Sequence, residues 1–274
     1  MKIKLDRLEL AIFVENEGEE GVIKKLGGKF DRKTKTWRIL PYKLIDLMNN
    51  AENVELDFKL SFSLSDNLFS KLKRNYELRD YQEEAVNELD KRDWRGVIVL
   101  PTGAGKTIIG LEAIYRLKVR TLIVVPTLDL MNQWIQKLSQ LLGLSKADIA
   151  LYGGGRKMFG EITISTYASA KTKDFLKAAV LRYGLVIFDE AHHLTGELSR
   201  EIARRLIAPY RIGLTATPGS KDDEELLSEL IGDIIRVTGF RELVEKGHLA
   251  PFVHKKIYVK LTEEEEIEYR ALME

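Results

Sequence analysis

Short apolar runs alternate with amphipathic segments over most of this 274-residue chain, from Leu78 onward. The runs comprise residues 96–100, 120–126, 149–153, 161–166, 185–189, 211–216 and 234–239. Because successive side chains of a strand point to opposite faces, a continuous apolar run indicates a strand that is buried on both faces. Intervening segments, such as residues 107–117 and 129–142, have the apolar spacing of helices. The alternation therefore predicts an α/β fold with a parallel sheet covered by helices, over residues 78–250.

The first 60 residues have a different pattern, which is typical of a small α+β domain. An alternating strand or hairpin segment is followed by a short helix, a second hairpin over residues 29–41, and another short helix. Three apolar side chains of the second hairpin are candidate core positions: Phe30, Trp37 and Ile39. Residues 61–77 are expected to form a polar connector to the larger domain.

The sequence PTGAGKT lies between a predicted strand and a predicted helix, in the order expected of a phosphate-binding loop. The strict pattern places glycine where this chain has Leu100, so it is missed by one residue. Backbone amides of such a loop bind phosphates, Lys106 can reach the β and γ phosphates, and Thr107 can ligate Mg²⁺. A simple glycine turn is disfavoured because strand, loop, Lys-Thr pair and helix all agree. The residues expected to bind ATP here are Thr102, Gly103, Ala104, Gly105, Lys106 and Thr107.

The apolar run at residues 185–189 ends in the carboxylate of Asp189, and a second carboxylate, Glu190, follows it directly. In a phosphate-loop protein, a strand-end aspartate holds the magnesium shell and an adjacent glutamate can polarise the attacking water. Asp189 is therefore the predicted magnesium ligand, and Glu190 the predicted general base.

The neighbouring histidines, His192 and His193, raise the alternative of a zinc site. Zinc requires three or four ligands presented together. Adjacent side chains diverge, the chain has no cysteine, and the remaining histidines are His248 and His254. The sequence therefore favours magnesium over zinc. His192 is expected to couple the nucleotide to the rest of the domain, whereas His193 is expected to be a packing or surface residue.

Taken in order, PTGAGKT, DEAH and LTATP resemble motifs I, II and III of superfamily 2 helicases, which implies a RecA-like fold for residues 78–250. LRDYQEEAV resembles the Q motif of that superfamily, in which Gln82 would bind the adenine edge with support from Arg79. VVPTLDLMNQW and ISTYASA resemble motifs Ia and Ib, which line the nucleic-acid track. The resemblance assigns DNA contacts to Pro126, Thr127, Thr166 and Tyr167. It assigns coupling to Thr215, Ala216 and Thr217.

Within the superfamily the chain is most similar to archaeal XPB helicases. Residues 27–48 resemble the XPB damage-recognition domain, and residues 248–269 resemble the end of its first helicase domain. The resemblance implies an ATP-dependent DNA helicase or translocase of DNA repair, including nucleotide excision repair, or of transcription-associated DNA opening. It implies ATP and Mg²⁺ as cofactors. The implied partners are double-stranded or forked DNA, together with a nuclease or a repair or transcription factor, which the family leads us to expect.

One element of XPB is altered. XPB carries Arg-Glu-Asp shortly after motif III, where this chain has Lys221, Asp222 and Asp223. Lys221-Asp222-Asp223 has the same order of charges, positive, acidic, acidic, but lysine lacks the planar fork of arginine. A charged helix start with Ser220 as its N-cap is the equally favoured interpretation.

A superfamily 2 motor also requires a second RecA-like domain, which supplies an arginine finger. Residues 251–274 are expected to form a terminal strand and the start of a connection to that domain, so we interpret the chain as the N-terminal half of a longer protein. Arg79 and Arg211 lie where the family uses them for packing or adenine support. The resemblance therefore implies that the finger comes from elsewhere.

Composition adds few constraints on partners. The net charge is +1, so a DNA-binding surface must be local. The absence of cysteine excludes disulfides and fits an intracellular compartment, and no apolar run approaches the roughly 20 residues needed to span a membrane.

Arg32, Lys33 and Lys35 on a predicted hairpin turn are either phosphate contacts or a solvated turn. Gly153 to Gly155, before two basic residues, are either a phosphodiester contact or a flexible turn.

Two rival functions stay open from sequence. One is another double-stranded DNA translocase of the same superfamily, of the restriction or remodelling type. The other is a DNA- or partner-binding module whose motor motifs are idle in this chain.

Overall fold

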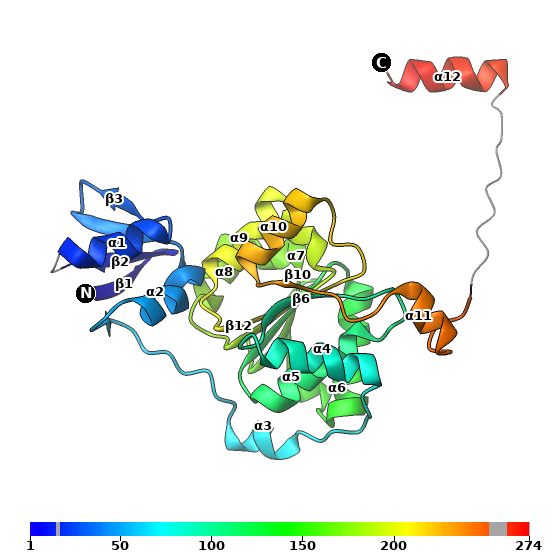
Figure 1. Ribbon diagram of the computed structural model, residues 1–274, viewed down its shortest axis with the longest axis horizontal. Helices are drawn as coiled ribbons and strands as arrows, with labels where there is room; N and C mark the ends of the chain where they lie inside the picture. The colour runs from blue at the N-terminus through cyan, green and yellow to red at the C-terminus, as the bar shows by residue number, and fades with distance from the viewer. Residues whose placement is uncertain (15–16, 252–261, 274) are drawn as a thin grey trace.

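The computed structural model describes residues 1–14, 17–251 and 262–273. Two sheets organise the chain (Figure 1). The first has five strands in the order β3-β4-β2-β1-β5, and the second has eight in the order β13-β6-β12-β11-β7-β10-β8-β9.

The first sheet belongs to an N-terminal unit. Its strands are β1 (Lys2–Asp6), β2 (Glu9–Phe13), β3 (Lys29–Asp31), β4 (Thr36–Ile39) and β5 (Glu55–Leu56). β1 and β2 form a hairpin in which Ile3 pairs with Ile12, and both side chains are buried. The helices α1 (Glu17–Lys25) and α2 (Leu44–Asn50) complete the unit. The α+β character predicted for this region is therefore present.

The core predicted for the second hairpin is partly wrong. Trp37 and Ile39 are buried, but Phe30 is 50% exposed. Phe30 lies opposite Trp37 with ring centroids 5.5 Å apart. Because β3 is the edge strand of its sheet, no further strand covers the outer flank of Phe30.

The second sheet is parallel apart from its last strand. Its parallel strands are β6 (Arg95–Val99), β7 (Thr121–Val125), β8 (Ile149–Gly153), β10 (Ile162–Thr166), β11 (Leu185–Asp189), β12 (Tyr210–Thr215) and β13 (Ile234–Ile235). β6 and β12 begin one residue before their predicted runs, the other five parallel strands lie within theirs, and every residue of β7, β8, β10 and β11 is buried. β9 (Arg156–Lys157) pairs antiparallel with β8 at the edge.

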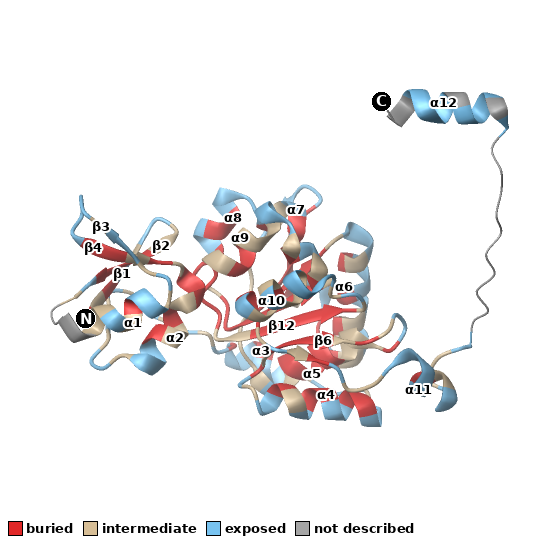
Figure 2. Cartoon of the chain, turned by 45° about the horizontal axis from the view of Figure 1, so that its top comes forward, coloured by how far each residue is buried: buried red, intermediate tan, exposed pale blue. Residues whose placement is uncertain are grey.

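Helices cover both faces of this sheet (Figures 1 and 2). One apolar core includes side chains of α4 (Asp80–Asp90), α5 (Lys106–Leu117) and α6 (Leu128–Leu142). The opposite core includes side chains of α7 (Tyr167–Ala170), α8 (Lys173–Ala179), α9 (Glu197–Arg205) and α10 (Lys221–Leu230). This is the covered parallel sheet expected from the apolar runs.

Residues 61–77 are more ordered than their polar composition indicates. They include α3 (Asp66–Lys71), and Leu64 and Leu68 are buried in the core on the α4–α6 side. The amide of Lys73 donates to the carbonyl of Leu142 at 3.0 Å. The segment expected to be a plain connector therefore packs along the second sheet.

Side-chain hydrogen bonds join the N-terminal unit to the unit of the larger sheet. The Tyr42 hydroxyl donates to Glu229 at 2.6 Å, and Arg95 donates to Asp46 at 3.0 Å. Val180 and Ile207 of the larger unit join the apolar core of the N-terminal unit.

Beyond β13 lie α11 (Phe240–Glu245) and α12 (Glu263–Met273). The terminal strand expected after residue 251 falls on residues 252–261, outside the described part of the chain. Among the helices that the structure describes, none is long and apolar enough to cross a membrane.

Candidate functional site

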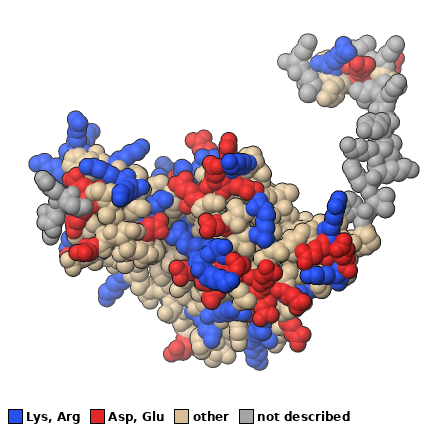
Figure 3. Space-filling model, viewed as in Figure 1, with Lys and Arg blue, Asp and Glu red and all other residues tan. Residues whose placement is uncertain are grey.

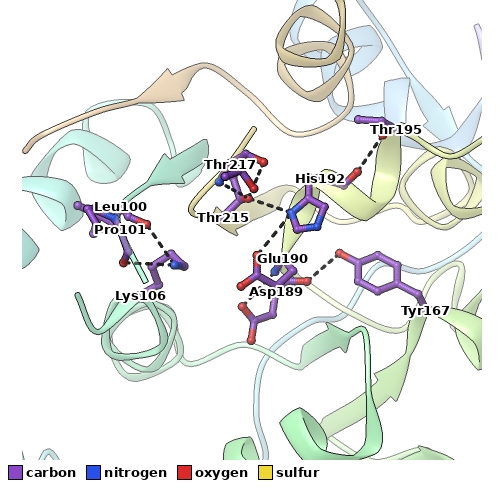
Figure 4. A network of polar contacts seen from close by, with 10 residues as sticks. All are labelled: Leu100, Pro101, Lys106, Tyr167, Asp189, Glu190, His192, Thr195, Thr215 and Thr217. Carbon is purple, nitrogen blue, oxygen red and sulfur yellow. Dashed lines mark hydrogen bonds and ion pairs between the residues drawn. The ribbon is translucent and has the colours of Figure 1, made fainter. Parts of the chain in front are cut away.

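The predicted motifs lie at the carboxyl ends of neighbouring parallel strands. The phosphate loop follows β6, Asp189 ends β11 with Glu190 directly after it, and Thr215 ends β12. Because β12 pairs with both β6 and β11, these three motifs meet at one edge of the sheet (Figure 4). The carboxyl edge is where open α/β sheets bind ligands.

The phosphate loop depends on two glycines with left-handed backbones. Gly103 has φ 84° and Gly105 has φ 78°, conformations that side-chain-bearing residues rarely adopt. A Cβ atom on Gly105 would also lie 2.6 Å from Nε2 of Gln82. The loop thus closes tightly against α4 before α5 begins at Lys106.

Lys106 points from the start of α5 toward the carboxylates. Its ammonium group donates to the carbonyls of Leu100 at 3.1 Å and Pro101 at 3.4 Å. Burial lowers the pKa of Lys106, and the nearby charges of Glu190 and Asp189 oppose that shift. The cation and the acidic pair therefore face one another.

Asp189 is buried and held from several sides. Its Oδ2 accepts a hydrogen bond from Nε1 of Trp134 at 2.8 Å, and its Oδ1 accepts one from the amide of Glu190 at 3.1 Å. Its backbone carbonyl accepts a hydrogen bond from the Tyr167 hydroxyl at 3.0 Å. The carboxylate is thus oriented by its neighbours rather than free to rotate.

Two residues of α6 belong to this site and were not predicted. Trp134 contacts Asp189, and the ammonium group of Lys137 donates to the hydroxyl of Thr107 at 3.0 Å. Burial lowers the pKa of Lys137, while Asp189 acts to raise it. Residues three apart on a helix lie on the same side, so this spacing was the only signal available in the sequence.

Glu190 connects the acidic pair to motif III. Its backbone is left-handed, with φ 50°, and its Oε2 lies 3.4 Å from Nδ1 of His192. The same imidazole nitrogen lies 3.1 Å from the hydroxyl of Thr215, which itself donates to the carbonyl of Thr217 at 3.1 Å. This chain of contacts is consistent with the coupling expected of His192, Thr215 and Thr217.

His193 contacts neighbouring aromatic rings, and Ala216 lines a cavity. The rings of His192 and His193 stack with centroids 4.6 Å apart, and Tyr167 lies 5.3 Å from His193. Burial, followed by the charge of His192, lowers the pKa of His193. Ala216 lines a cavity of about 370 Å³ with Leu100 and other residues.

Across the described ranges, no group of three or more His, Asp or Glu side chains is arranged to hold a metal ion.

The Q-motif residues hold the phosphate loop in place through hydrogen bonds. Gln82 is buried, its Oε1 accepts from the amide of Arg79 at 3.0 Å, and its Nε2 donates to the carbonyl of Ala104 at 3.1 Å. Tyr81, which sequence reasoning missed, donates to the same carbonyl at 2.8 Å and accepts from Arg79 at 3.1 Å. Both groups of the Gln82 amide are thus engaged with backbone.

The residues expected to contact DNA lie at the carboxyl ends of β7 and β10. Thr127 is the N-cap of α6, where its hydroxyl accepts from the amide of Leu130 at 3.2 Å, and Pro126 precedes it. Thr166 caps α7 in the same way, accepting from the amide of Ser169 at 3.3 Å. Tyr167 is buried with its hydroxyl bonded to Asp189, so its ring is not a surface for a nucleic-acid ligand.

Two basic candidate surfaces lie elsewhere. Gly154 and Gly155 have positive φ values and form the turn before β9, whose Arg156 and Lys157 are exposed. Arg32, Lys33 and Lys35 are exposed on the turn between β3 and β4, and they are not brought to the nucleotide loop. Figure 3 shows basic side chains gathered at the β3 end of the N-terminal unit.

Two further sequence-predicted positions have structural roles. Ser220 caps α10 in a capping box, and Asp223 accepts from the Ser220 amide at 2.9 Å and its hydroxyl at 2.8 Å. Arg211 is fully buried and donates to four backbone carbonyls, those of Ala203, Leu206, Ala208 and Leu230. Packing is therefore the role of Arg211.

Comparison with known proteins gives a consistent result. Residues 75–220 match the ResIII model, described as "Type III restriction enzyme, res subunit". The DNA 3′-5′ translocase XPB2 of Sulfurisphaera tokodaii is 40% identical over 248 residues, which are 90% of this chain and 54% of the relative. The general transcription and DNA repair factor IIH helicase/translocase subunit XPB/SSL2 of Saccharomyces cerevisiae is 29% identical over 82% of this chain and 27% of the relative.

A solved structure is similar in fold. The Pyrococcus furiosus Hef helicase domain superposes with a TM-score of 0.51 at 28% identity, over 58% of this chain and 37% of the other. The chain spans about half the length of the Sulfurisphaera tokodaii relative and about a quarter of the yeast relative.

Proposed function

The chain belongs to the ResIII family and has a RecA-like helicase fold, and on that premise we propose that it is the nucleotide-binding half of an XPB-like, ATP-driven DNA translocase or helicase. One observation carries the proposal. Lys106 begins α5 directly after the phosphate loop that follows β6, and its ammonium group faces the charges of Glu190 and Asp189 at the end of β11, as phosphoryl transfer requires.

Nucleotide use accompanies the helicase family, and magnesium is our further proposal. The residues fit such an ion, because the Thr107 hydroxyl and the Asp189 carboxylate already attract a cation, the ammonium group of Lys137. Thr107 and Asp189 would hold the metal, which would neutralise charge on the phosphates. Lys106 would bind the β and γ phosphates, and Glu190 would orient the attacking water and accept its proton.

We assign support of the nucleotide to the Q-motif residues Gln82 and Arg79. We assign coupling between the nucleotide and the rest of the domain to motif III. Gln82 and Arg79 reinforce the loop through the Ala104 carbonyl and Tyr81, and the adenine contact expected of Gln82 is part of the proposal. His192 connects Glu190 with Thr215, which gives a path from the γ phosphate to β12.

DNA is the proposed nucleic acid, and movement from 3′ to 5′ is the proposed polarity, by analogy with the Sulfurisphaera tokodaii relative. Pro126, Thr127 and Thr166 are the proposed contacts on this unit. A second helicase domain of the parent protein, a role in repair or transcription and an intracellular, nucleoid-associated location belong to the same proposal. A nuclease or repair factor is the partner that we propose from the family resemblance.

Calorimetric titration with Mg²⁺-ATP tests the nucleotide site. Lys106→Ala removes a charge-assisted hydrogen bond to phosphate worth about 1.5–3 kcal/mol, so affinity should fall roughly 10- to 150-fold. Equal affinity of the wild-type protein and the Lys106→Ala variant for Mg²⁺-ATP would rule out the proposed site.

ATP hydrolysis by the full-length parent separates the rival functions. Stimulation by double-stranded DNA above single-stranded DNA and RNA supports the translocase. Because the matching family model carries a restriction-enzyme description, the parent should also be assayed for DNA cleavage with a nuclease partner absent. DNA binding without any DNA-stimulated turnover would favour the idle module.

A further inference from the structure

A buried carboxylate, that of Glu112, lies in the middle of α5. The residue is 2% exposed, and the other buried residues of this helix, within 109–114, are uncharged. Three side chains donate to it. Oε2 accepts hydrogen bonds from Nε of Arg74 and from the hydroxyl of Tyr76, both at 2.9 Å, and Oε1 accepts one from Nε of Arg116 at 2.7 Å. Glu112 therefore links α5 to the segment that precedes the Q motif.

That segment, residues 72–79, forms neither helix nor strand. It runs past α5 and α6, which lie side by side in Figure 1. The amide of Asn75 donates to the carbonyl of Leu141 in the last turn of α6 at 2.9 Å, while the side chains of Arg74 and Tyr76 reach α5. Backbone bonds to one helix and side-chain bonds to the other thus hold the same stretch of chain.

The held stretch leads directly to Gln82. Three residues, 77–79, connect Tyr76 to the start of α4. Consecutive Cα atoms are about 3.8 Å apart, so this short link has little freedom once Tyr76 is fixed. The amide of Arg79 donates to Oε1 of Gln82 at 3.0 Å, and Nε2 of Gln82 donates to the carbonyl of Ala104 at 3.1 Å. The orientation of Gln82 therefore depends on the segment that Glu112 holds.

The Gln82 amide retains the groups that a base requires. A side-chain amide has two N–H donors and two acceptor lone pairs, and the two bonds to backbone use one of each. The remaining donor and acceptor match N7 and N6 of adenine, which a glutamine can bind with two hydrogen bonds. α5 thus carries Lys106 at its first residue and, six residues or roughly 9 Å further along, the carboxylate that supports the base-binding segment.

Stability alone gives little reason to bury this charge. Burial by itself would raise the pKa of Glu112, but hydrogen bonds from Arg116, Tyr76 and Arg74 outweigh it and lower that pKa, so the carboxylate stays ionised at neutral pH. Well-packed apolar side chains often stabilise a fold as well as a buried ion pair does. What a set of supporting hydrogen bonds adds is the fixed geometry of a neighbouring binding site.

We propose that Glu112 is a positioning residue for the adenine part of the nucleotide site, acting through Arg74 and Tyr76. It does not touch the nucleotide. It fixes the segment that orients Gln82, whereas the phosphates are bound by the loop and by Lys106. The inference rests on the proposed nucleotide site, and it predicts that loss of the Glu112 contacts weakens binding of the base but not of the phosphates.

Calorimetric titration of the 274-residue chain with Mg²⁺-ATP and with Mg²⁺-tripolyphosphate separates the two parts of the site, because tripolyphosphate has neither base nor ribose. Tyr76→Phe keeps the ring and removes one donor to Glu112, and Arg74→Met removes another. Each variant should bind Mg²⁺-ATP about three- to tenfold more weakly, the effect of one lost hydrogen bond, and Mg²⁺-tripolyphosphate within about twofold of the wild type.

Arg116→Met is the matched control. Arg116 donates to the same carboxylate but from α5 itself, so its replacement leaves the bonds from Arg74 and Tyr76 in place. All three variants should have a lower free energy of unfolding in urea, yet Arg116→Met should keep its Mg²⁺-ATP affinity within about twofold of the wild type. A purely structural role of Glu112 would not make this distinction.

Three results would overturn the inference: unchanged Mg²⁺-ATP affinity in both Tyr76→Phe and Arg74→Met, equal losses for Mg²⁺-ATP and Mg²⁺-tripolyphosphate, or an equal loss of Mg²⁺-ATP affinity in Arg116→Met. In each case a wild-type protein that binds both ligands would leave the proposed function standing. Failure of the proposed function has a different signature, because the wild-type protein would then bind neither ligand, and the role of Glu112 would fall with it.

Discussion

The ammonium group of Lys137 lies 3.0 Å from the hydroxyl oxygen of Thr107, and it is attracted to Asp189. A lysine from α6 therefore stands beside both of the residues that we propose as magnesium ligands. Since one positive charge repels another at this range, a metal ion that binds with the nucleotide must displace Lys137.

Replacing Lys137 should consequently ease metal binding. In Lys137→Met, the magnesium concentration that half-saturates binding of a fluorescent ATP analogue should fall about tenfold, which corresponds to about 1.4 kcal/mol. The matched control is Gln136→Met, an exposed neighbour on α6. Weaker nucleotide binding at every magnesium concentration would show instead that Lys137 is a phosphate ligand.

The acidic pair should separate binding from hydrolysis. In the full-length parent, Glu190→Gln should still bind Mg²⁺-ATP but barely hydrolyse it, because the water loses its base. Asp189→Asn should weaken the magnesium-dependent part of binding. Elemental analysis of metal-stripped protein should detect no zinc. Normal turnover in Glu190→Gln, or stoichiometric zinc, would contradict the assignment.

We expect the 274-residue chain alone to bind ATP but to turn it over near background, even with DNA present. Arg79 is bonded to Tyr81 and Arg211 to backbone carbonyls, so neither is poised as an arginine finger. Such a finger is worth roughly 10³–10⁵ in rate in related nucleotide hydrolases. Adding the rest of the parent protein should restore hydrolysis, and brisk turnover by the isolated monomer would disprove the half-motor interpretation.

The basic turn of the N-terminal unit should act through electrostatics if it contacts DNA. Combined Ala substitution of Arg32, Lys33 and Lys35 should weaken binding with little change in sequence preference, and should reduce the salt slope by about 0.7–0.9 for each lost contact. Triple Ala substitution of the exposed residues Lys91, Lys177 and Lys246 controls for net charge. An identical loss in both triple variants would favour the solvated-turn interpretation.

Arg211 should be a stability residue. Arg211→Lys cannot satisfy four carbonyls, so it should lower the free energy of unfolding by about 3 kcal/mol or more, as measured by urea denaturation. Arg182→Lys, at a more exposed arginine with one carbonyl contact, should change it by less than about 0.5 kcal/mol. Similar stability of the two variants would remove the structural role assigned to Arg211.

The sequence by itself determined the parallel sheet, the phosphate loop and the acidic pair. Each is a local pattern: a strand buried on both faces must be apolar at consecutive positions, and the glycines of the loop are needed where φ is positive. Strand ends then bring Lys106 and Asp189 together, because parallel strands place their carboxyl ends at one edge of the sheet.

Tertiary structure alone decided which residues surround those motifs. Lys137, Trp134 and Tyr81 have the spacing of ordinary helix residues, and they reach the site because α4 and α6 pack beside α5. Packing likewise exposed Phe30 on an edge strand and buried Tyr167 against Asp189. These outcomes depend on contacts between residues far apart in the chain, which no local pattern encodes.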